Sequence, residues 1–309
     1  MTNIVVGVDG GATRTRVIVA DETGTELGAI VGDASAVRPG AAAHSADVII
    51  DLVRHALAAS DLDADATIAA LCVGVAGVGR DSEYSAFFKE LTTRSTAEEL
   101  VVLPDAMVAL TDAFGEESGI LLVAGTGSMA FGRGPTGKMA RCGGWGPVCG
   151  DEGSGQWIGR RALSVVTAAS DGREPETALL GVLLTHLQLE APDELVPWAA
   201  TASAAQLAQL ATPVMAVAAT GDLRANSLCT LAAEELALHV RTLARQLFAD
   251  ERAAVPVALA GGLMERGSFL RRLVEHRLKS AVPGCLLHAR EVVPARGAVR
   301  TALGLLART

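Results

Sequence analysis

The sequence predicts an α/β protein of two lobes, each a mixed sheet flanked by helices, and three observations support this. The chain has 309 residues, more than one globular domain usually holds. Half of the residues are apolar, which suits a sizeable core. Apolar runs that end in glycine turns occur near residue 10 and again near residue 125, and each begins a series of strands and helices. The two halves therefore look like loose copies of one α/β unit.

The first half begins as an antiparallel meander, because three short apolar runs are separated by a glycine turn and a D-E-T-G turn. Pro104 opens a helix that carries Asp105, in keeping with the preference of proline for a first turn. In chain order we expect strands at 3–7, 15–20 and 26–31, a helix at 43–59, a strand at 68–75, a helix at 81–93 and a strand at 100–103.

The second half repeats this order and adds a helical insertion. From residue 151 onward the pattern is mainly helical, and Asp222 caps a long helix. We expect strands at 120–124, 129–132 and 137–141, a helix at 222–250, a strand at 255–260 and a final helix at 295–307. The predicted lobes are 1–115, joined by the last helix at 296–309, and 116–295.

Composition and charge restrict the function. The formal net charge of −9 argues against a general nucleic-acid binder, which needs a basic surface to neutralise phosphates. There is no basic cluster for a membrane surface and no run as long as a membrane span, so we expect no membrane partner. The five cysteines lack any C-x-x-C pair, and the first residues lack a signal-peptide pattern, which together indicate a cytoplasmic protein.

The first glycine turn is a candidate phosphate site. Gly10 and Gly11 directly follow a strand, and glycine lets phosphate oxygens approach consecutive backbone N–H groups. Thr13 adds a hydroxyl donor, and Asp9 at the strand end is suited to hold a hydrated magnesium ion. An ordinary hairpin turn explains this segment equally well when it is taken alone.

Two more glycine turns follow apolar strands. Thr126, Gly127 and Ser128 lie in a turn at the equivalent point of the second half, where a second turn would clamp a phosphate chain from the opposite side. Gly261 and Gly262 would offer bare backbone to a flat ligand such as adenine. Close packing between a strand and a helix is the favoured explanation of that last segment on its own.

Asp105 is the residue singled out for chemistry. It stands at the first turn of a helix just beyond a strand, where open α/β sheets present their reactive groups. A hydroxyl is a poor nucleophile, and a carboxylate within hydrogen-bond reach can orient it and accept its proton. The alternative is a carboxylate that only stabilises the helix dipole.

Residues 143–155 form the segment with the most glycine, six in thirteen positions, and we expect a loop whose backbone touches a ligand. Asp151 and Glu152 would receive sugar hydroxyls, and Trp145 would supply a flat apolar wall. Asp151 is also a candidate cap of the helix that follows. None of the six histidines falls inside these clusters, and packed or solvated roles are expected for all of them.

Together these motifs resemble those of the N-acetylglucosamine kinases among the BadF/BadG/BcrA/BcrD-type ATPases, within the sugar kinase, Hsp70 and actin superfamily. The match runs in order over nearly the whole chain. Its motifs are GVDGGATRTRV at 7–17, PDA at 104–106, AGTGS at 124–128, CGGWGPVCGDEGS at 142–154, LAGG at 259–262 and GAVRTALG at 297–304.

The resemblance implies two RNase H-like, or actin-like ATPase, lobes with ATP and an amino sugar in the cleft between them. It implies that Asp105 is the base acting on the 6-hydroxyl of the sugar and that Asp9 lies near Mg²⁺. The implied ATP-binding residues are Gly10, Gly11, Thr13, Thr126, Gly127, Ser128, Gly261 and Gly262. The implied sugar-binding residues are Gly77, Thr126, Gly127, Cys142, Gly144, Trp145 and Asp151. A homodimer is left open.

One departure concerns the sugar. The kinases carry a sugar-contacting asparagine in the loop after the third strand, and residues 32–40 contain none. Ser35 and Arg38 are candidate replacements, and glucosamine or N-acetylmuramic acid as substrate is the alternative. Arg38 would be a sensible partner for a lactyl carboxylate.

Two other classes of function are weighed against the kinase. The dehydratase and reductase activators of the same broad family hold an iron–sulfur cluster with paired cysteines from two subunits, and the cysteines here fall elsewhere. A sugar or nucleotide sensor without catalysis is the third class, and Asp105 argues against it.

Overall fold

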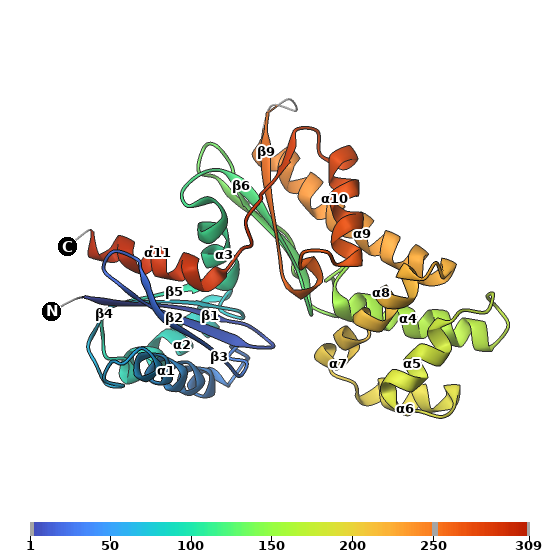
Figure 1. Ribbon diagram of the computed structural model, residues 1–309, viewed down its shortest axis with the longest axis horizontal. Coiled ribbons are helices and arrows are strands. Elements are labelled where there is room, and N and C mark those ends of the chain that lie inside the picture. Colours follow the sequence, from blue (N-terminus) through green and yellow to red (C-terminus); the bar gives the residue numbers. More distant parts are fainter. Residues whose placement is uncertain (1–2, 249–252, 308–309) are drawn as a thin grey trace. The chain divides into compact units, whose positions relative to one another are not determined.

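The computed structural model describes residues 3–248 and 253–307, and the chain divides into two compact units. Unit 1 comprises Met1–Glu117 and Arg290–Thr309, and unit 2 comprises Ser118–Ala289. The last helix thus belongs to the same unit as the first strands (Figure 1).

Unit 1 is built on a five-stranded mixed sheet in the order β3-β2-β1-β4-β5. β2 pairs antiparallel with β1 and β3, whereas β4 pairs in parallel with β1 and β5. The strands are β1 (Ile4–Gly10), β2 (Thr15–Asp21), β3 (Glu26–Gly32), β4 (Ile68–Val75) and β5 (Ala97–Pro104).

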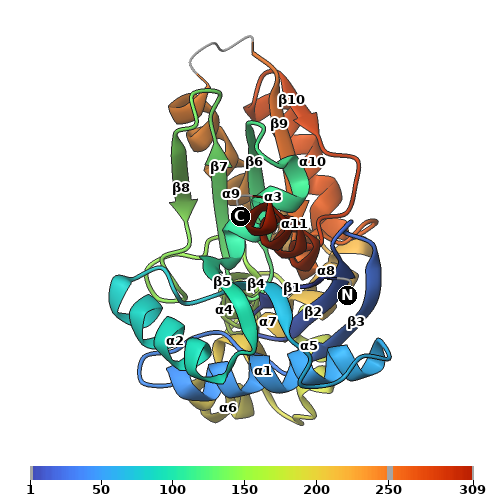
Figure 2. The same ribbon diagram turned by 90° about the vertical axis from the view of Figure 1, so that its left-hand side faces the viewer.

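Helices cover both faces of this sheet (Figure 2). Successive side chains of a strand point to opposite faces, so Val6 and Val8 of β1 join one core and Val5 joins the other. Gly7 allows the last helix to approach β1, since a Cβ there would lie 2.4 Å from the Ala295 carbonyl oxygen. The helices are α1 (Ala42–Ala59) and α2 (Asp81–Arg94) on one face, and α3 (Asp105–Phe114) and α11 (Pro294–Leu306) on the other.

Unit 2 repeats the sheet with the same strand order and directions. Its order is β10-β9-β6-β7-β8, in which β7 pairs antiparallel with β6 and β8, and β9 pairs in parallel with β6 and β10. β6 therefore corresponds to β1, and the turn after it to the turn after β1. The strands are β6 (Gly119–Ala124), β7 (Ser128–Arg133), β8 (Met139–Gly143), β9 (Val255–Ala260) and β10 (Cys285–Leu287).

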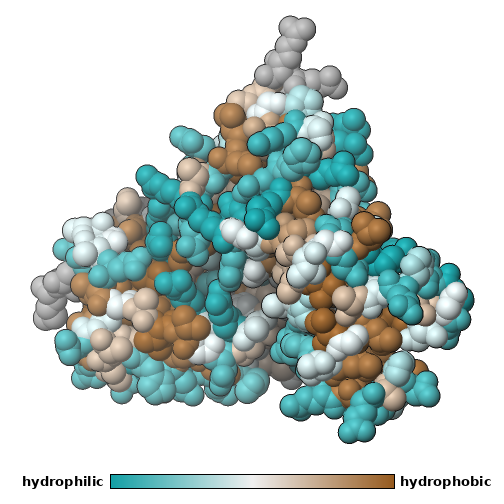
Figure 3. Space-filling model, turned by 45° about the vertical axis from the view of Figure 1, so that its right-hand side comes forward, coloured by the Kyte–Doolittle hydropathy of each residue, from teal (hydrophilic) through white to brown (hydrophobic). Residues whose placement is uncertain are grey.

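The helices of unit 2 include the insertion expected from the sequence. α9 packs on β6, β7 and β8, and α10 packs on α9. Apolar side chains reach the surface of this helical part (Figure 3), where Val196 and Leu223 are 69% and 81% exposed. The helices are α4 (Gly155–Ser170), α5 (Leu179–Leu187), η1 (Pro192–Glu194), α6 (Leu195–Thr201), α7 (Ala204–Gln209), α8 (Ala211–Ala219), α9 (Leu223–Leu247), η2 (Gly262–Met264) and α10 (Phe269–Ala281).

The predicted α/β fold class is confirmed, with differences at the ends of elements. Asp222 caps α9 as predicted, through Arg224 and Ala225 N–H, but the helix ends at Leu247 and the predicted end at residue 250 lies outside the described residues. The short strand β10 was not predicted, because three residues carry too little periodicity. Within the described ranges, no helix has both the length and the apolar character that a membrane span requires.

Candidate active site

Asp9 and Asp105 are two carboxyl groups at the carboxyl edge of the unit 1 sheet. β1 and β5 flank β4 in parallel, so Asp9 near the end of β1 and Asp105 just after β5 share this edge. Burial and, next, the charge of Asp105 raise the pKa of Asp9 to about 7, opposed by Arg14 and Arg16. Burial also raises the pKa of Asp105, although Ala106 N–H donates to its Oδ1 at 2.9 Å. The edge therefore has two acidic groups that favour a cation or a proton nearby.

The glycine turn after β1 is held by the loop that follows β3, and residues 12–14 of the turn are exposed. The Gly11 carbonyl oxygen accepts from the Ser35 N–H at 3.2 Å and from the Ala36 N–H at 3.1 Å. A Cβ on Gly10 would lie 2.6 Å from Ser35 Oγ, so the position has no room for a side chain. Thr13 is exposed at the tip of the turn. The predicted phosphate residues Gly10, Gly11 and Thr13 thus lie beside Asp9.

The loop after β3 supports this turn through the side chain of Ser35. Ser35 is only 2% exposed, and the Thr15 hydroxyl donates to its Oγ at 2.7 Å. Ser35 thus supports the turn through Thr15, and it stays a candidate replacement for the missing asparagine together with Arg38. Arg38 is exposed. Gly77 backs the same loop, since a Cβ there would lie 2.0 Å from the Val37 carbonyl oxygen.

The corresponding turn of unit 2 is held by the start of α4. The Gly125 N–H donates to the Gly127 carbonyl oxygen at 2.9 Å and closes the turn. Gly155 and Gln156 N–H donate to the carbonyl oxygens of Gly125 and Thr126 at 2.8 and 3.3 Å. The first amides of α4 therefore position the turn that carries Thr126 and Gly127.

Asp151 joins this turn to the glycine-rich loop 143–155. Its carboxylate accepts from the backbone N–H groups of Ser128 and Gly146, and burial raises its pKa against these hydrogen bonds. A Cβ on Gly127 would lie 2.8 Å from Asp151 Oδ2. The Ser128 hydroxyl donates to the Glu152 carbonyl oxygen at 2.7 Å. Ser128 and Asp151 thus fix the turn and the loop to each other.

Ser154, and not Asp151, caps α4. Its Oγ accepts from the Trp157 N–H at 3.2 Å. Asp151 instead has φ 59°, a left-handed conformation that is unusual for a residue other than glycine. The hypothesis that Asp151 caps the following helix is therefore wrong, and its backbone is shaped by the loop.

The other predicted sugar residues of unit 2 differ in exposure. Trp145 is 69% exposed, and the Arg141 guanidinium lies 4.9 Å from its ring centroid. Gly144 has φ 70°, which turns the chain beside Trp145. The Cys142 thiol is half-buried and hydrogen-bonded to Thr242 of α9, and burial raises its pKa. Trp145 is thus on the surface of the loop, whereas Cys142 faces α9.

Gly261 and Gly262 lie beside the Gly125 turn, because β9 and β6 are neighbouring parallel strands. A Cβ on Gly261 would lie 2.3 Å from the Ala124 carbonyl oxygen, so this glycine serves close packing. A Cβ on Gly262 would meet no described heavy atom within 4 Å. Of the pair, Gly262 is the one that presents bare backbone to open space.

His239 is a residue that sequence reasoning missed. It is on α9, it is 7% exposed, and its Nε2 lies 3.7 Å from Glu152 Oε2. A Cβ on Gly143 would lie 3.0 Å from His239 Nε2. The histidine therefore packs beneath the glycine-rich loop, some 90 residues away in the sequence, and only the burial of one face of α9 could have indicated it.

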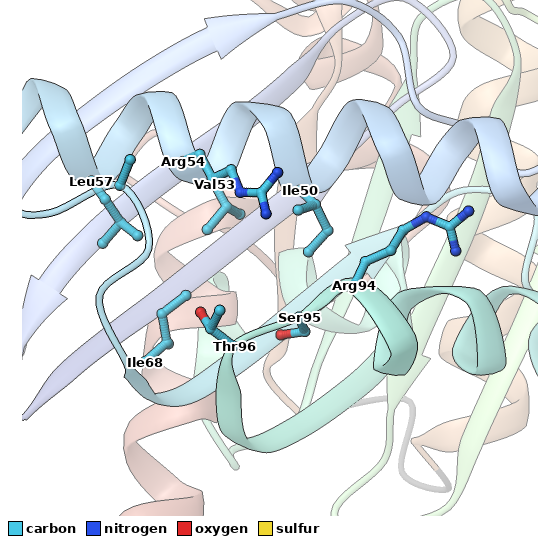
Figure 4. A pocket seen from close by; sticks show the side chains of 9 residues that line it. Ile50, Val53, Arg54, Leu57, Ile68, Arg94, Ser95 and Thr96 are labelled. Atoms are coloured by element: carbon cyan, nitrogen blue, oxygen red, sulfur yellow. The ribbon is translucent and has the colours of Figure 1, made fainter.

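Two surface hollows lie away from these residues. Figure 4 shows the first, a space of about 10 Å³ between α1 and the amino ends of β4 and β5, opposite the edge with Asp105. A space of this size holds no more than about one water molecule. The second is an open hollow of about 360 Å³ lined by Gly181, Val182, Thr185, His186 and Pro213 of α5 and α8. Neither contains a predicted site residue.

A repeated mixed sheet with a glycine turn after the first strand of each copy is the fold that this chain shares with solved sugar kinases, among them a glucokinase from Streptomyces griseus at a TM-score of 0.63. This chain belongs to the BadF/BadG/BcrA/BcrD ATPase family, whose profile matches residues 6–302.

Individual relatives are enzymes that act on amino sugars. The chain is 30% identical to the N-acetyl-D-glucosamine kinase of Dictyostelium discoideum, over 97% of this chain and 98% of that protein. It is 28% identical to the N-acetylmuramic acid/N-acetylglucosamine kinase of Clostridium acetobutylicum, over 86% and 87% of the two chains. The crystal structure of a protein from Chromobacterium violaceum, provisionally named an N-acetylglucosamine kinase, superposes with a TM-score of 0.82 at 30% identity and covers 97% of this chain and 99% of that one.

Proposed function

We propose that this protein is an ATP-dependent amino-sugar kinase that phosphorylates the 6-hydroxyl of N-acetylglucosamine or a related hexosamine. The observation that carries the proposal is Asp105, a half-buried carboxyl group with a raised pKa, beside Asp9 and the glycine turn after β1. The kinases among its relatives support an amino sugar as acceptor.

Asp105 acts as the general base. Its carboxylate accepts the proton of the 6-hydroxyl while the sugar oxygen forms a bond to the γ-phosphorus of ATP. The bond between this phosphorus and the bridging oxygen breaks, and ADP leaves with the electron pair. Positioning of the two substrates supplies most of the remaining rate enhancement in such transfers.

The glycine turns of both units bind the ATP phosphates in this proposal. In unit 1, Gly10 and Gly11 let phosphate oxygens approach the backbone and Thr13 supplies a hydroxyl donor, while the Gly11 N–H closes the turn by donating to the Arg14 carbonyl oxygen at 3.0 Å. In unit 2, Thr126 and Gly127 supply donors. Ser128 contributes by holding its turn, because its hydroxyl is bonded to Glu152. Gly262, with Gly261 behind it, offers open backbone to the adenosine.

Asp9 is the proposed ligand of Mg²⁺, and its environment fits that role. Its pKa is raised to about 7 by burial and by Asp105, so a cation bound there would stabilise the ionised form. Mg²⁺ is usually held by one or two carboxylates together with water and phosphate oxygens. When bound, Mg²⁺ neutralises charge on the phosphates.

The sugar residues of the proposal are those of the glycine-rich loop and of Gly77. Asp151 and the Gly144 backbone receive hydroxyl groups, and Trp145 covers an apolar face of the ring. Cys142, which faces α9, supports the loop from behind. Arg38 is exposed on the loop where the kinases carry asparagine, and it keeps N-acetylmuramic acid and glucosamine among the candidate substrates.

We further propose a cytoplasmic enzyme that works without nucleic-acid or membrane partners. The net charge of −9 and five free cysteines support this. A homodimer is proposed on the resemblance alone, and light scattering coupled to size-exclusion chromatography tests it.

Coupled ADP-release assays on the purified protein test the function. N-acetylglucosamine, glucosamine, N-acetylmuramic acid and no sugar are compared, each with ATP and Mg²⁺. We expect turnover that depends on the sugar and a product phosphorylated at position 6. ATP hydrolysis at the same rate with and without sugar would instead support an ATPase that activates a partner. Sugar binding without any ADP release would support a sensor.

A further inference from the structure

We propose that His239 is a positioning residue for the sugar: it supports the glycine-rich loop 143–155 from α9, and its protonation loosens this loop. The proposal rests on the proposed function for its kinetic part, because it assumes that Asp151 on this loop contacts the sugar. Its structural part, the support of the loop, stands on geometry alone.

The contacts of His239 reach both ends of the loop. The ring lies against Gly143, where a Cβ would meet Nε2 at 3.0 Å and Cε1 at 3.1 Å. At the other end, Nε2 lies 3.7 Å from Glu152 Oε2. Gly143 has φ 76°, a conformation that strains any larger residue, and the ring leaves little room for one. One side chain thus underlies the first turn of the loop and the residue next to Asp151.

The polar atoms of His239 are poorly satisfied in this arrangement. Nδ1 is buried without a hydrogen-bond partner among the described residues, and the 3.7 Å separation between Nε2 and Glu152 Oε2 is too long for a hydrogen bond. Buried polar groups are normally bonded, so an unpaired ring nitrogen makes the packing of the loop sensitive to the state of this ring. Packing against Gly143, more than hydrogen bonding, holds the histidine in place.

The charges around His239 set the direction of a pH response. Burial lowers its pKa, and Glu152, Glu235 and Asp151 act in the opposite sense. These three carboxylates come from the loop and from α9 itself. β8, which packs on α9, contributes Cys142, whose pKa is raised by burial so that the thiol stays neutral.

Protonation therefore works against the packed loop. Because the folded-state pKa of His239 is below the ordinary 6.5, the neutral ring stabilises the packed state at neutral pH. This stabilisation declines as the pH falls below 6.5 and is lost once the pH passes the folded-state pKa. A charged ring favours arrangements in which the ring or the loop reaches water, and Asp151 then loses its position.

Three variants test this inference. His239→Gln keeps a polar group near the position of Nε2 but does not titrate, and His239→Leu keeps bulk without polarity. His276→Gln is the matched control, because His276 is exposed on α10 of the same unit. Amide hydrogen exchange of residues 143–153, without ligands, is measured at pH 7.5 and 5.5 and corrected for intrinsic rates. KM for the sugar and KM for ATP are measured at the same pH values.

Between pH 7.5 and 5.5, the wild type and His276→Gln should lose loop protection, and their sugar KM should rise about tenfold more than that of His239→Gln. The pH response of the ATP KM, to which Asp9 contributes, should be the same in all three proteins. His239→Leu should raise the sugar KM at both pH values.

If hydrogen exchange in His239→Gln responds to pH as it does in the wild type, the inference is overturned. If His239→Leu changes the KM for the sugar and the KM for ATP equally, His239 does not position the sugar. A wild type without sugar-dependent turnover would contradict the proposed function. The hydrogen-exchange data would still decide whether His239 supports the loop. If His239→Leu does not fold, the exchange data of His239→Gln decide.

Discussion

The glycine turns after β1 and after β6 occupy equivalent places in two sheets of the same strand order, yet they are anchored differently. In unit 1 the short loop between β3 and α1 supplies two amides to the Gly11 carbonyl. In unit 2 the chain between β8 and α9 contains five further α-helices, and both the start of α4 and the glycine-rich loop hold the turn. Topology thus places both turns, and the connection after the third strand decides what each turn is joined to.

The two regions also differ in chemistry. The turn of unit 1 is beside two acidic groups, Asp9 and Asp105, whose pKa values are raised by burial. The turn of unit 2 is beside bare backbone at Gly262 and a carboxylate, Asp151, that is held by two amides. In the proposed enzyme, unit 1 therefore supplies proton transfer and the metal ligand, and unit 2 supplies the sugar loop.

Asp105→Asn should produce the largest effect and would break the assignment of catalysis to unit 1. We expect turnover to fall at least ~100-fold, the usual contribution of a positioned base, with sugar and ATP affinity largely kept. Steady-state kinetics and equilibrium binding measure this. Asp81→Asn, an exposed residue at the start of α2, is the control and should keep normal turnover. Near-normal turnover of Asp105→Asn would remove this residue from the mechanism.

Gly127→Ala compared with Gly125→Ala tests the link between the turn and the loop of unit 2. A Cβ on Gly127 meets the fixed carboxylate of Asp151 at 2.8 Å, whereas a Cβ on Gly125 has its nearest atom 3.8 Å away. We expect Gly127→Ala to cost ~1–3 kcal/mol of stability and to raise the sugar KM, and Gly125→Ala to change stability by less than ~0.5 kcal/mol. Thermal unfolding and kinetics check both, and equal effects would contradict the tight contact.

Asp9→Asn tests the acidic edge of unit 1 through stability. Since the folded-state pKa of about 7 exceeds the ordinary 3.8, ionisation of Asp9 destabilises the fold progressively as the pH rises between these values. Without Mg²⁺ and ATP, the variant should match the wild type below pH ~4 and be ~1–2 kcal/mol more stable at pH 8, allowing for solvent relaxation. Melting temperatures across this range measure the difference. A constant difference at every pH would show that charge is not its cause.

Ser35→Ala and Ser128→Ala compare the side-chain hydrogen bonds that hold the two turns, and we expect their effects to be the smallest. Each removes one buried side-chain hydrogen bond, to Thr15 or to Glu152, and should cost ~1 kcal/mol. We expect Ser35→Ala to raise the KM for ATP alone, and Ser128→Ala to raise the KM for both ATP and the sugar, because Ser128 holds the phosphate turn of unit 2 to the loop with Asp151. If Ser128→Ala left the sugar KM unchanged, or Ser35→Ala raised it, the division of roles between the two turns would fail.

Much of the fold was predictable because strand and turn signals are local. The alternation of apolar runs with glycine turns located every strand of the two sheets except β10, and Asp222 marked the start of α9. Asp105 and the three glycine turns were also visible, since each directly follows an apolar strand. The role of Ser35 was not, because its burial comes from a contact with Thr15, twenty residues away, that no local pattern encodes.

The glycine-rich loop shows the same limit in more detail. Its composition predicted a loop, but the cap of α4 fell on Ser154 instead of Asp151, three positions away along a segment in which both residues are good caps. His239 gave no signal at all as a neighbour of this loop, since it is one of many residues on the buried face of a long helix.

By itself, the sequence determined the α/β class, the repeat of one unit, and the residues able to perform chemistry, because periodicity, turn residues and functional groups are properties of short segments. Tertiary structure alone decided which of these groups are buried, which carbonyls and amides hold the turns, and which carboxyl groups share an edge. Those properties arise only when strands that are distant in the sequence become neighbours, because only then are side chains removed from water and closely packed.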